Sequence, residues 1–468
     1  MIPYFPKQIT YRAIIVYLAS LTVVSLMYFD FAMSAKYIIL GLIWVLGFFF
    51  LTNYLTKTWD RNRYIGFASR LFIIALALRL VWVVFFYYYC LSTNASPFEY
   101  AAADSIGYHE EAKWLASENW SVAMRYYFGP NSYGISDVGY PLYLTVLYKL
   151  IGPNVFIPRV IKAFLSAFTC ILVYKMSSRT FGEETGRMAG IMTALMPNLI
   201  IYCGYHLKET EMLFLEVTFL ERLDYVVREK RITAQSILLQ TLLAGSLFFF
   251  RTVLGAAALF AFASTVLLSS TPVMKKGWRR TALIAWGVLG IIVFGGGRAT
   301  LEMESLWEQK DESVIGKRGD QTAAGNQWAQ YATGAVMAPM AFVLPYATMV
   351  DVDQQYGQQE KSGGNYVRNF MGFFVLIAIY EAIRRKQWRG FVLIGSFVIA
   401  YLGTVSLSGF SNAERFLLPG LPCLIMMWAY GVSVLREKTY RFLFPWCIVV
   451  FIMEVGWAFF KLGSRGLF

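Results

Sequence analysis

Long runs of hydrophobic residues recur along this chain, and short polar segments separate them. An α-helix needs about 20 apolar residues, at a rise of 1.5 Å each, to cross a hydrocarbon core roughly 30 Å thick. The pattern therefore predicts an all-α polytopic membrane protein with about 13 transmembrane helices. The predicted spans are residues 11–29, 37–55, 67–91, 157–178, 188–204, 210–227, 234–250, 252–270, 281–297, 366–383, 390–408, 415–435 and 442–462.

Lysine and arginine cluster in alternate connections between these spans, as is typical of cytoplasmic loops. This parity places the N-terminus inside and the C-terminus outside, with two long outer loops at 92–156 and 298–365. Loops of that length are usually functional. In the first, the apolar segment 141–151 is too short to cross, so we expect a re-entrant or interfacial helix beside other outer-face juxtamembrane helices. In the second, Pro339 and Pro345 interrupt the apolar stretch 335–350 and favour another interfacial element.

The spans and loops suggest four parts of the chain. Residues 1–66 hold two additional N-terminal helices, and residues 67–297 form a core that includes the long loop 92–156. Residues 298–365 form the second outer loop, and residues 366–468 hold the C-terminal helices.

The composition is that of a membrane protein, and the distribution of its charges argues against a nucleic-acid partner. With 57% hydrophobic and 15% charged residues over 468 positions, the chain does not have the composition of a soluble domain. The net charge of +13 sits largely in the cytoplasmic loops, so we attribute it to membrane orientation and expect no nucleic-acid partner. The five cysteines lie in or beside apolar runs without paired spacing, which indicates packing residues. No signal-peptide cleavage site follows Lys7 and Arg12, so we expect a retained first helix.

A polar island at residues 99–111 interrupts the apolar pattern in the first outer loop. Asp104 could act there as a general base or as a metal-binding carboxylate, with Tyr108 and Glu111 on the same helical face at i+4 and i+7. It could equally cap an amphipathic helix at 105–118, and the two roles can coexist.

Other charged residues fall on the same outer side by parity. Lys208 could meet an anionic group while Glu209 orients it, or its stem could lie in lipid with an intrahelical acidic partner. Arg251, in a turn between two apolar runs, could hold a phosphate or extend to the interface. Arg415 opens a span beside Glu414, which offers it a local ion pair.

Together these residues suggest a class of substrate. Outer-face cations, an outer-face carboxylate and the surrounding lipid fit a molecule with a phosphate at headgroup level and an apolar tail, such as a polyprenyl-phosphate sugar.

The histidines give little further indication of the chemistry of the site. His109 is one of two in the chain, a histidine in a loop is more often solvated than functional, and no metal-ligand spacing is present.

The order of several short motifs resembles the GT-C superfamily of membrane glycosyltransferases, in the branch of the protein O-mannosyltransferases and the lipid A aminoarabinose transferase. The resemblance covers roughly residues 67–435. Many members have Asp-Glu where this chain has Asp104-Ser105, and the aminoarabinose enzyme has lysine where this chain has Tyr140. The matching segments are Ala103–Ala112, Gly139–Tyr143, Pro158–Val160, Ala194–Pro197, Lys208–Glu209 and Arg415–Pro419.

The resemblance implies an inverting transfer of sugar from a polyprenyl-phosphate donor to a lipid, glycan or protein acceptor. Asp104 would be the base or would support a divalent metal ion. The residues implied for the donor phosphate are Lys208, Arg251, Arg415 and Arg159, and the supporting residues are Tyr108, His109, Glu111, Tyr140, His206 and Glu209. We expect the protein in a bacterial inner (plasma) membrane with its site on the extracytoplasmic face. The alternatives are a polysaccharide polymerase or ligase that uses a lipid-linked oligosaccharide, and a transporter of a lipid-linked precursor.

Overall fold

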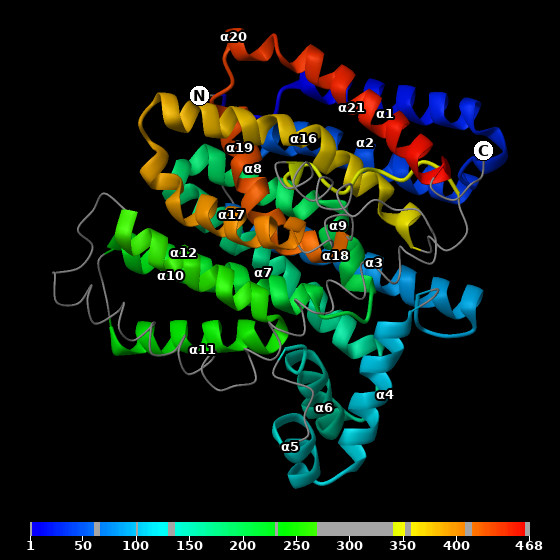
Figure 1. The fold of residues 1–468 in the computed structure, drawn as a ribbon, viewed down its shortest axis with the longest axis vertical. Helices are drawn as coiled ribbons and strands as arrows, with labels where there is room; N and C mark the ends of the chain where they lie inside the picture. The colour runs from blue at the N-terminus through cyan, green and yellow to red at the C-terminus, as the bar shows by residue number, and fades with distance from the viewer. Residues whose placement is uncertain are drawn as a thin grey trace.

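The computed structural model describes residues 2–59, 66–99, 102–129, 136–229, 233–268, 340–351, 357–407 and 414–463. These residues are almost entirely helical, and the one β-type contact among them is an isolated bridge between Ala32 and Val350. Most helices run side by side in a single bundle (Figure 1). The first half consists of α1 (Lys7–Met27), η1 (Phe29–Phe31), α2 (Ala35–Thr58), α3 (Phe67–Asn94), α4 (Ala103–Ser117), α5 (Trp120–Phe128), α6 (Gly139–Ile151), α7 (Phe156–Phe181), α8 (Glu183–Leu195) and α9 (Pro197–Gly204). The second half consists of α10 (Glu209–Glu229), α11 (Ala234–Phe250), α12 (Thr252–Leu268), α16 (Gln358–Arg384), η3 (Trp388–Phe391), α17 (Val392–Leu407), α18 (Glu414–Leu417), η4 (Leu418–Gly420), α19 (Leu421–Ser433), α20 (Glu437–Tyr440) and α21 (Leu443–Gly463).

Eight helical segments of the described chain are long and apolar enough to cross a membrane. They are α1, α2, α3, α7, α16 and the continuous segments Trp388–Ser406, Glu414–Ser433 and Glu437–Gly463. The protein is therefore a polytopic integral membrane protein, as predicted. Of the other five predicted spans, α11 and α12 are apolar but have 17 residues each, α10 carries acidic residues along its length, and 281–297 lies outside the described residues.

The predicted continuous span 188–204 is wrong, because the chain breaks between α8 and α9. Met196 has an extended backbone and Pro197 begins the next helix. Proline has no N–H, so the carbonyl four residues earlier, that of Thr193, loses its helical partner. The break redirects α9 within the bundle instead of continuing α8.

A buried arginine satisfies the carbonyls that this break leaves open. The Arg79 guanidinium donates to the Thr193 oxygen at 3.2 Å and to the Ala194 oxygen at 3.1 Å. It also donates to Ser166 Oγ at 2.6 Å and is fully buried. Unpaired carbonyls in an apolar interior are costly, so Arg79 stabilises the α8–α9 corner by joining it to α3 and α7.

The second predicted outer loop needs correction where the structure describes it. Residues 358–365, assigned to the loop, form the first two turns of α16, so the helix that contains the predicted span 366–383 begins before that span. Of the predicted interfacial stretch 335–350, residues 340–350 form a short turn and an extended segment that is largely buried. Asn369 of α16 donates to two of its carbonyls, which holds this segment against the bundle. Residues 335–339 lie outside the described part.

The segment predicted as the first outer loop forms a group of three short helices, α4, α5 and α6, that projects from one side of the bundle (Figure 1). The predicted helix at 105–118 is confirmed as α4, and the short segment 141–151 is confirmed as a helix, α6. Sequence reasoning did not find α5. At 13 residues α6 is too short to cross a bilayer.

Every second connection between the long helices lies at the same end of the bundle. At one end, which we call the basic end, Arg384, Arg385 and Arg436 all form ion pairs with Glu381. At the other end, which we call the site end, Lys461 of α21 donates to Thr348, and the turn after α1 pairs with Val350. This arrangement agrees with the alternation that the loop charges predict.

We predict that Arg79→Met destabilises the protein. The substitution leaves two buried carbonyls at the α8–α9 corner without donors, at a cost of about 1–3 kcal/mol each. The midpoint of thermal unfolding of the purified protein in detergent should therefore fall clearly, and it should recover partly in Arg79→Lys. An unchanged midpoint for Arg79→Met would contradict the proposed role of this side chain.

Candidate functional site

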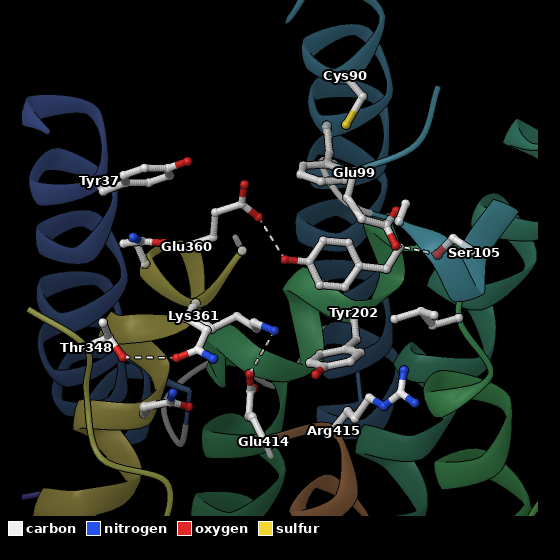
Figure 2. A pocket seen from close by; sticks show the side chains of 18 of the residues that line it. Tyr37, Cys90, Glu99, Ser105, Tyr202, Thr348, Glu360, Lys361, Glu414 and Arg415 are labelled. Atoms are coloured by element: carbon white, nitrogen blue, oxygen red, sulfur yellow. Dashed lines mark hydrogen bonds and ion pairs between the residues drawn. The ribbon is translucent and has the colours of Figure 1, made fainter. Parts of the chain in front are cut away.

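A cavity of about 750 Å³ opens at the site end of the bundle, and we call it the polar cavity (Figure 2). Its walls come from α2, α3, α4, α9, α16, α18, α21 and the segment before α16. Many of its lining side chains are charged or carry hydroxyl or amide groups. A polar hollow of this size in an otherwise apolar bundle can hold a ligand with a sugar-sized polar part.

Asp104 and Arg415 meet at the wall of the polar cavity. Arg415 Nη1 donates to Asp104 Oδ2, so the pair joins α4 to α18 across 311 positions of the chain. Both side chains stay partly exposed, at 47% for Asp104 and 35% for Arg415. The structure thus brings together two residues that the sequence singled out separately.

Two local alternatives for these residues are wrong. The helix α4 begins at Ala103 and has no side-chain cap, so Asp104 lies inside the first turn and does not cap it. Arg415 does not pair with its neighbour Glu414, because the two side chains point to different partners.

Glu414 is buried and links three elements behind the cavity wall. Its carboxylate lies 3.4 Å from Lys361 Nζ and accepts a hydrogen bond from Asn198. Asn198 also donates to Asn365 at 2.9 Å, so α9, α16 and α18 share one polar network. Sequence reasoning did not identify Lys361, Asn198 or Asn365. The feature of the sequence that could have identified Asn198 is its position directly after Pro197 in an apolar run.

Arg159 lies behind the cavity wall and does not line it. Its guanidinium is 0% exposed, and Nη2 lies 4.0 Å from Glu99 Oε2. Within the described residues none of its three nitrogens has a hydrogen-bond partner. Glu99 itself lines the cavity and accepts a hydrogen bond from Ser105, next to Asp104. Arg159 therefore lies behind the cavity wall, with its guanidinium near the Glu99 carboxylate that lines the cavity.

The predicted phosphate ligands Lys208 and Arg251 lie just outside the polar cavity. Lys208 Nζ pairs with Asp137 and donates to the Phe250 carbonyl at 3.2 Å. Burial lowers the pKa of Lys208, and the nearby Asp137 opposes that shift. The interpretation in which Glu209 or Glu211 is the partner of Lys208 is therefore wrong.

Arg251 connects this region to Arg415 through an aromatic ring. The Arg251 guanidinium lies 4.5 Å from the Phe416 ring centre, and that of Arg415 lies 5.0 Å from it. Arg251 also donates to the Tyr401 hydroxyl at 3.1 Å and lies 3.8 Å from Glu209. Two arginines thus flank one phenylalanine, and cation–π contacts hold them there.

The chain's two histidines meet at one tyrosine between α4, α6 and the turn before α10. His109 Nδ1 lies 2.8 Å from the Tyr148 hydroxyl, which lies 3.3 Å from His206 Nε2. His109 is only 13% exposed, so its interpretation as a solvated residue is wrong. Burial lowers the pKa of both rings, and the cations Lys162 and Arg159 add to the shift at His206.

The remaining supporting residues pack around this histidine pair. The ring of Tyr108 contacts that of Tyr140 edge-on, with 5.3 Å between centroids, and Tyr140 also contacts the His206 ring. Burial raises the pKa of Glu111, which interacts with Tyr127 of α5. These contacts fix α4 against α6 and the turn at 205–208.

A resident metal does not fit the described residues. Within them no group of three or more His, Cys, Asp or Glu side chains gathers where an ion could bind. Asp104 has an arginine, Arg415, as its partner. The reaction proposed below uses no metal ion.

Comparison with known proteins does not place this chain in a family. No protein-family model matches it, and no curated protein matches it.

Because both histidines are buried, we predict that they lower the free energy of unfolding in mild acid. Above pH 6.5, the usual histidine pKa, both rings are neutral whether the chain is folded or unfolded. Below it the unfolded chain takes up protons that the folded chain does not, at up to about 1.4 kcal/mol per pH unit for each histidine. The histidine pair should therefore lower the thermal midpoint in detergent between pH 7.5 and pH 5.5, while the raised pKa of the buried Glu111 carboxyl acts in the opposite direction.

His206→Gln should reduce that fall, because it removes one of the two protons while its amide can still hydrogen-bond Tyr148. The same shift in the variant as in the unmodified protein would show that other groups cause the pH dependence.

Proposed function

We propose that this protein is a membrane glycosyltransferase that moves a sugar from a polyprenyl-phosphate donor to an acceptor hydroxyl on the extracytoplasmic side. The observation that carries the proposal is the pair of Asp104 and Arg415 at the wall of a polar cavity in an apolar bundle. A carboxylate base beside a phosphate-binding cation is what such a transfer needs. The motif order that resembles the GT-C superfamily supports the same assignment.

The donor phosphate would bind at Arg415. Arginine matches a phosphate with paired donors, and Arg251, which contacts the same Phe416 ring, would add positive charge. Lys208 lies in the same region and faces Phe250 and Asp137. The polyprenyl tail would remain in the lipid around the bundle, so the phosphate enters at headgroup level.

The ion pair between Asp104 and Arg415 would couple the base to the donor. Arg415 Nη1 donates to Asp104 Oδ2, so this oxygen has a partner that must leave before it can accept the acceptor proton. A donor phosphate would compete for Arg415 and release Asp104 beside the reacting centre. The Asp104 carboxylate would then be free to accept the proton only when the donor is bound.

The reaction is a single displacement. The acceptor oxygen forms a bond to the anomeric carbon while the bond from that carbon to the phosphate oxygen breaks. The acceptor proton goes to the Asp104 carboxylate, and the polyprenyl phosphate leaves with the bonding electron pair. Arg415 stabilises the charge that develops on the leaving phosphate, and the anomeric configuration inverts.

The far side of the polar cavity offers room for the acceptor. Glu360 and Lys361 lie there on the first turn of α16, opposite Ser105 and Arg415 (Figure 2), and Gln358 of the same turn also lines the cavity. Their amide, carboxylate and ammonium groups suit a hydroxyl-rich acceptor, whether it is carried on a lipid, a glycan or a protein.

We predict that Asp104→Asn lowers turnover by about 10²–10⁴-fold, because asparagine keeps the shape but cannot take the acceptor proton. The assay uses the purified protein in detergent, radiolabelled polyprenyl-phosphate sugars as donors and membrane extract as the source of acceptor. The thermal midpoint should stay near that of the unmodified protein. Full activity of the variant would refute Asp104 as the base.

The same assay separates the proposal from its alternatives. Detergent leaves no second compartment, so a transporter would give no covalent product there. A mass spectrum of the product distinguishes one added sugar residue from a transferred oligosaccharide block, which would indicate a polymerase or ligase.

We further predict that Arg415→Gln lowers kcat/KM for the donor by about 10- to 100-fold, the effect of losing a charged hydrogen bond to phosphate. Lys36→Gln is the matched control, since Lys36 also lines the polar cavity but lies beside Tyr37 and Tyr89. Equal losses in the two variants would contradict a specific phosphate contact at Arg415.

A further inference from the structure

A second cavity, of about 880 Å³, lies at the basic end of the bundle and plays no part in the proposed reaction. It forms where α7 ends, where α16 turns into η3 and beside α19, toward the left of Figure 1. Lys386 and Arg389 line it together with Trp388 and three further aromatic residues. We call it the basic pocket.

The basic pocket combines two cations with no acidic residue in its lining. At the same end Arg384, Arg385 and Arg436 all converge on the buried Glu381 carboxylate. Lys386 and Arg389, by contrast, form no ion pair with any carboxylate that the structure describes. The positive charge of this pocket is thus available to an anion from outside the chain.

The floor of the basic pocket is aromatic. The rings of Phe181, Phe391 and Tyr430 contact one another with centroids 4.7, 4.8 and 4.9 Å apart. The Tyr430 hydroxyl donates to Gln387 Oε1 at 3.3 Å, which joins this floor to the turn that carries the cations. An apolar floor of this kind contributes nothing to a bare phosphate ion, but it suits the glycerol and upper acyl part of a lipid.

The level of the basic pocket relative to the membrane also favours a lipid as its ligand. It lies at the ends of membrane-crossing helices, where phospholipid headgroups must lie. Trp388 is 43% exposed at its rim, and tryptophan is enriched at that level of the membrane. The Arg389 guanidinium lies 5.5 Å from the Trp388 ring centre, which keeps the cation at the rim.

We propose that the basic pocket binds the headgroup of an anionic phospholipid. Lys386 and Arg389 contact its phosphate, and the glycerol backbone lies on the floor of Phe181, Phe391 and Tyr430. The site is separate from the polar cavity and is independent of the proposed glycosyl transfer.

The test measures lipid binding to the full-length protein in detergent by native mass spectrometry. The probes are dioleoyl-phosphatidylglycerol, dioleoyl-phosphatidylcholine and glycerol 3-phosphate. We expect tight binding of phosphatidylglycerol alone, weakened about fivefold by Lys386→Gln or Arg389→Gln and about 30-fold by both together. The matched control is the double variant Lys438→Gln, Arg441→Gln, which removes two exposed cations of the same end that do not line the pocket.

Three outcomes would overturn the proposal. An equal loss in the control variant would mean that general positive charge binds the lipid. Equal binding of phosphatidylcholine would mean that charge is not recognised, and equal binding of glycerol 3-phosphate would identify a soluble phosphate as the ligand. Thermal midpoints of all variants confirm that any loss of binding is not a loss of fold.

Discussion

A helix that breaks inside an apolar bundle must find donors for the carbonyls it leaves open, and the arrangement of the site end depends on how this chain does so. Arg79 supplies those donors at the corner between α8 and α9. Because the corner is held, α9 carries Asn198 to the Glu414 network and Tyr202 to the wall of the polar cavity. The backbone requirement of one proline thus determines where side chains from distant helices meet.

Ion pairs gather at both ends of the bundle. At the basic end three arginines share one buried carboxylate, Glu381, and Arg179 pairs with Glu221 and Asp224. At the site end most cations have their own acidic partner from another element, as Lys361 has Glu414 and Lys208 has Asp137. Removing one member of such a buried pair would leave the other charge unpaired, so a ligand that displaces one member must itself supply the missing charge.

The sequence was sufficient for features that depend on apolar length, since these follow from a simple physical limit. It also indicated Asp104 and Arg415, which stand out as charges beside apolar runs. It did not reveal that they pair with each other, nor that Glu414 pairs with Lys361, because such contacts depend on how helices far apart in the chain pack. The break at Pro197 was readable from the missing N–H of proline, but a continuous apolar run concealed it.

The contact between Asp104 and Arg415 also has a consequence for biosynthesis. Its two members are 311 positions apart, so the ribosome completes the acidic partner early and the basic partner near the end of synthesis. During most of membrane insertion the carboxylate on α4 therefore has no arginine to meet. A chain that stops before α18 would contain most of its apolar helices yet lack a finished cavity wall. The pair thus distinguishes a fully assembled protein from a nearly complete one.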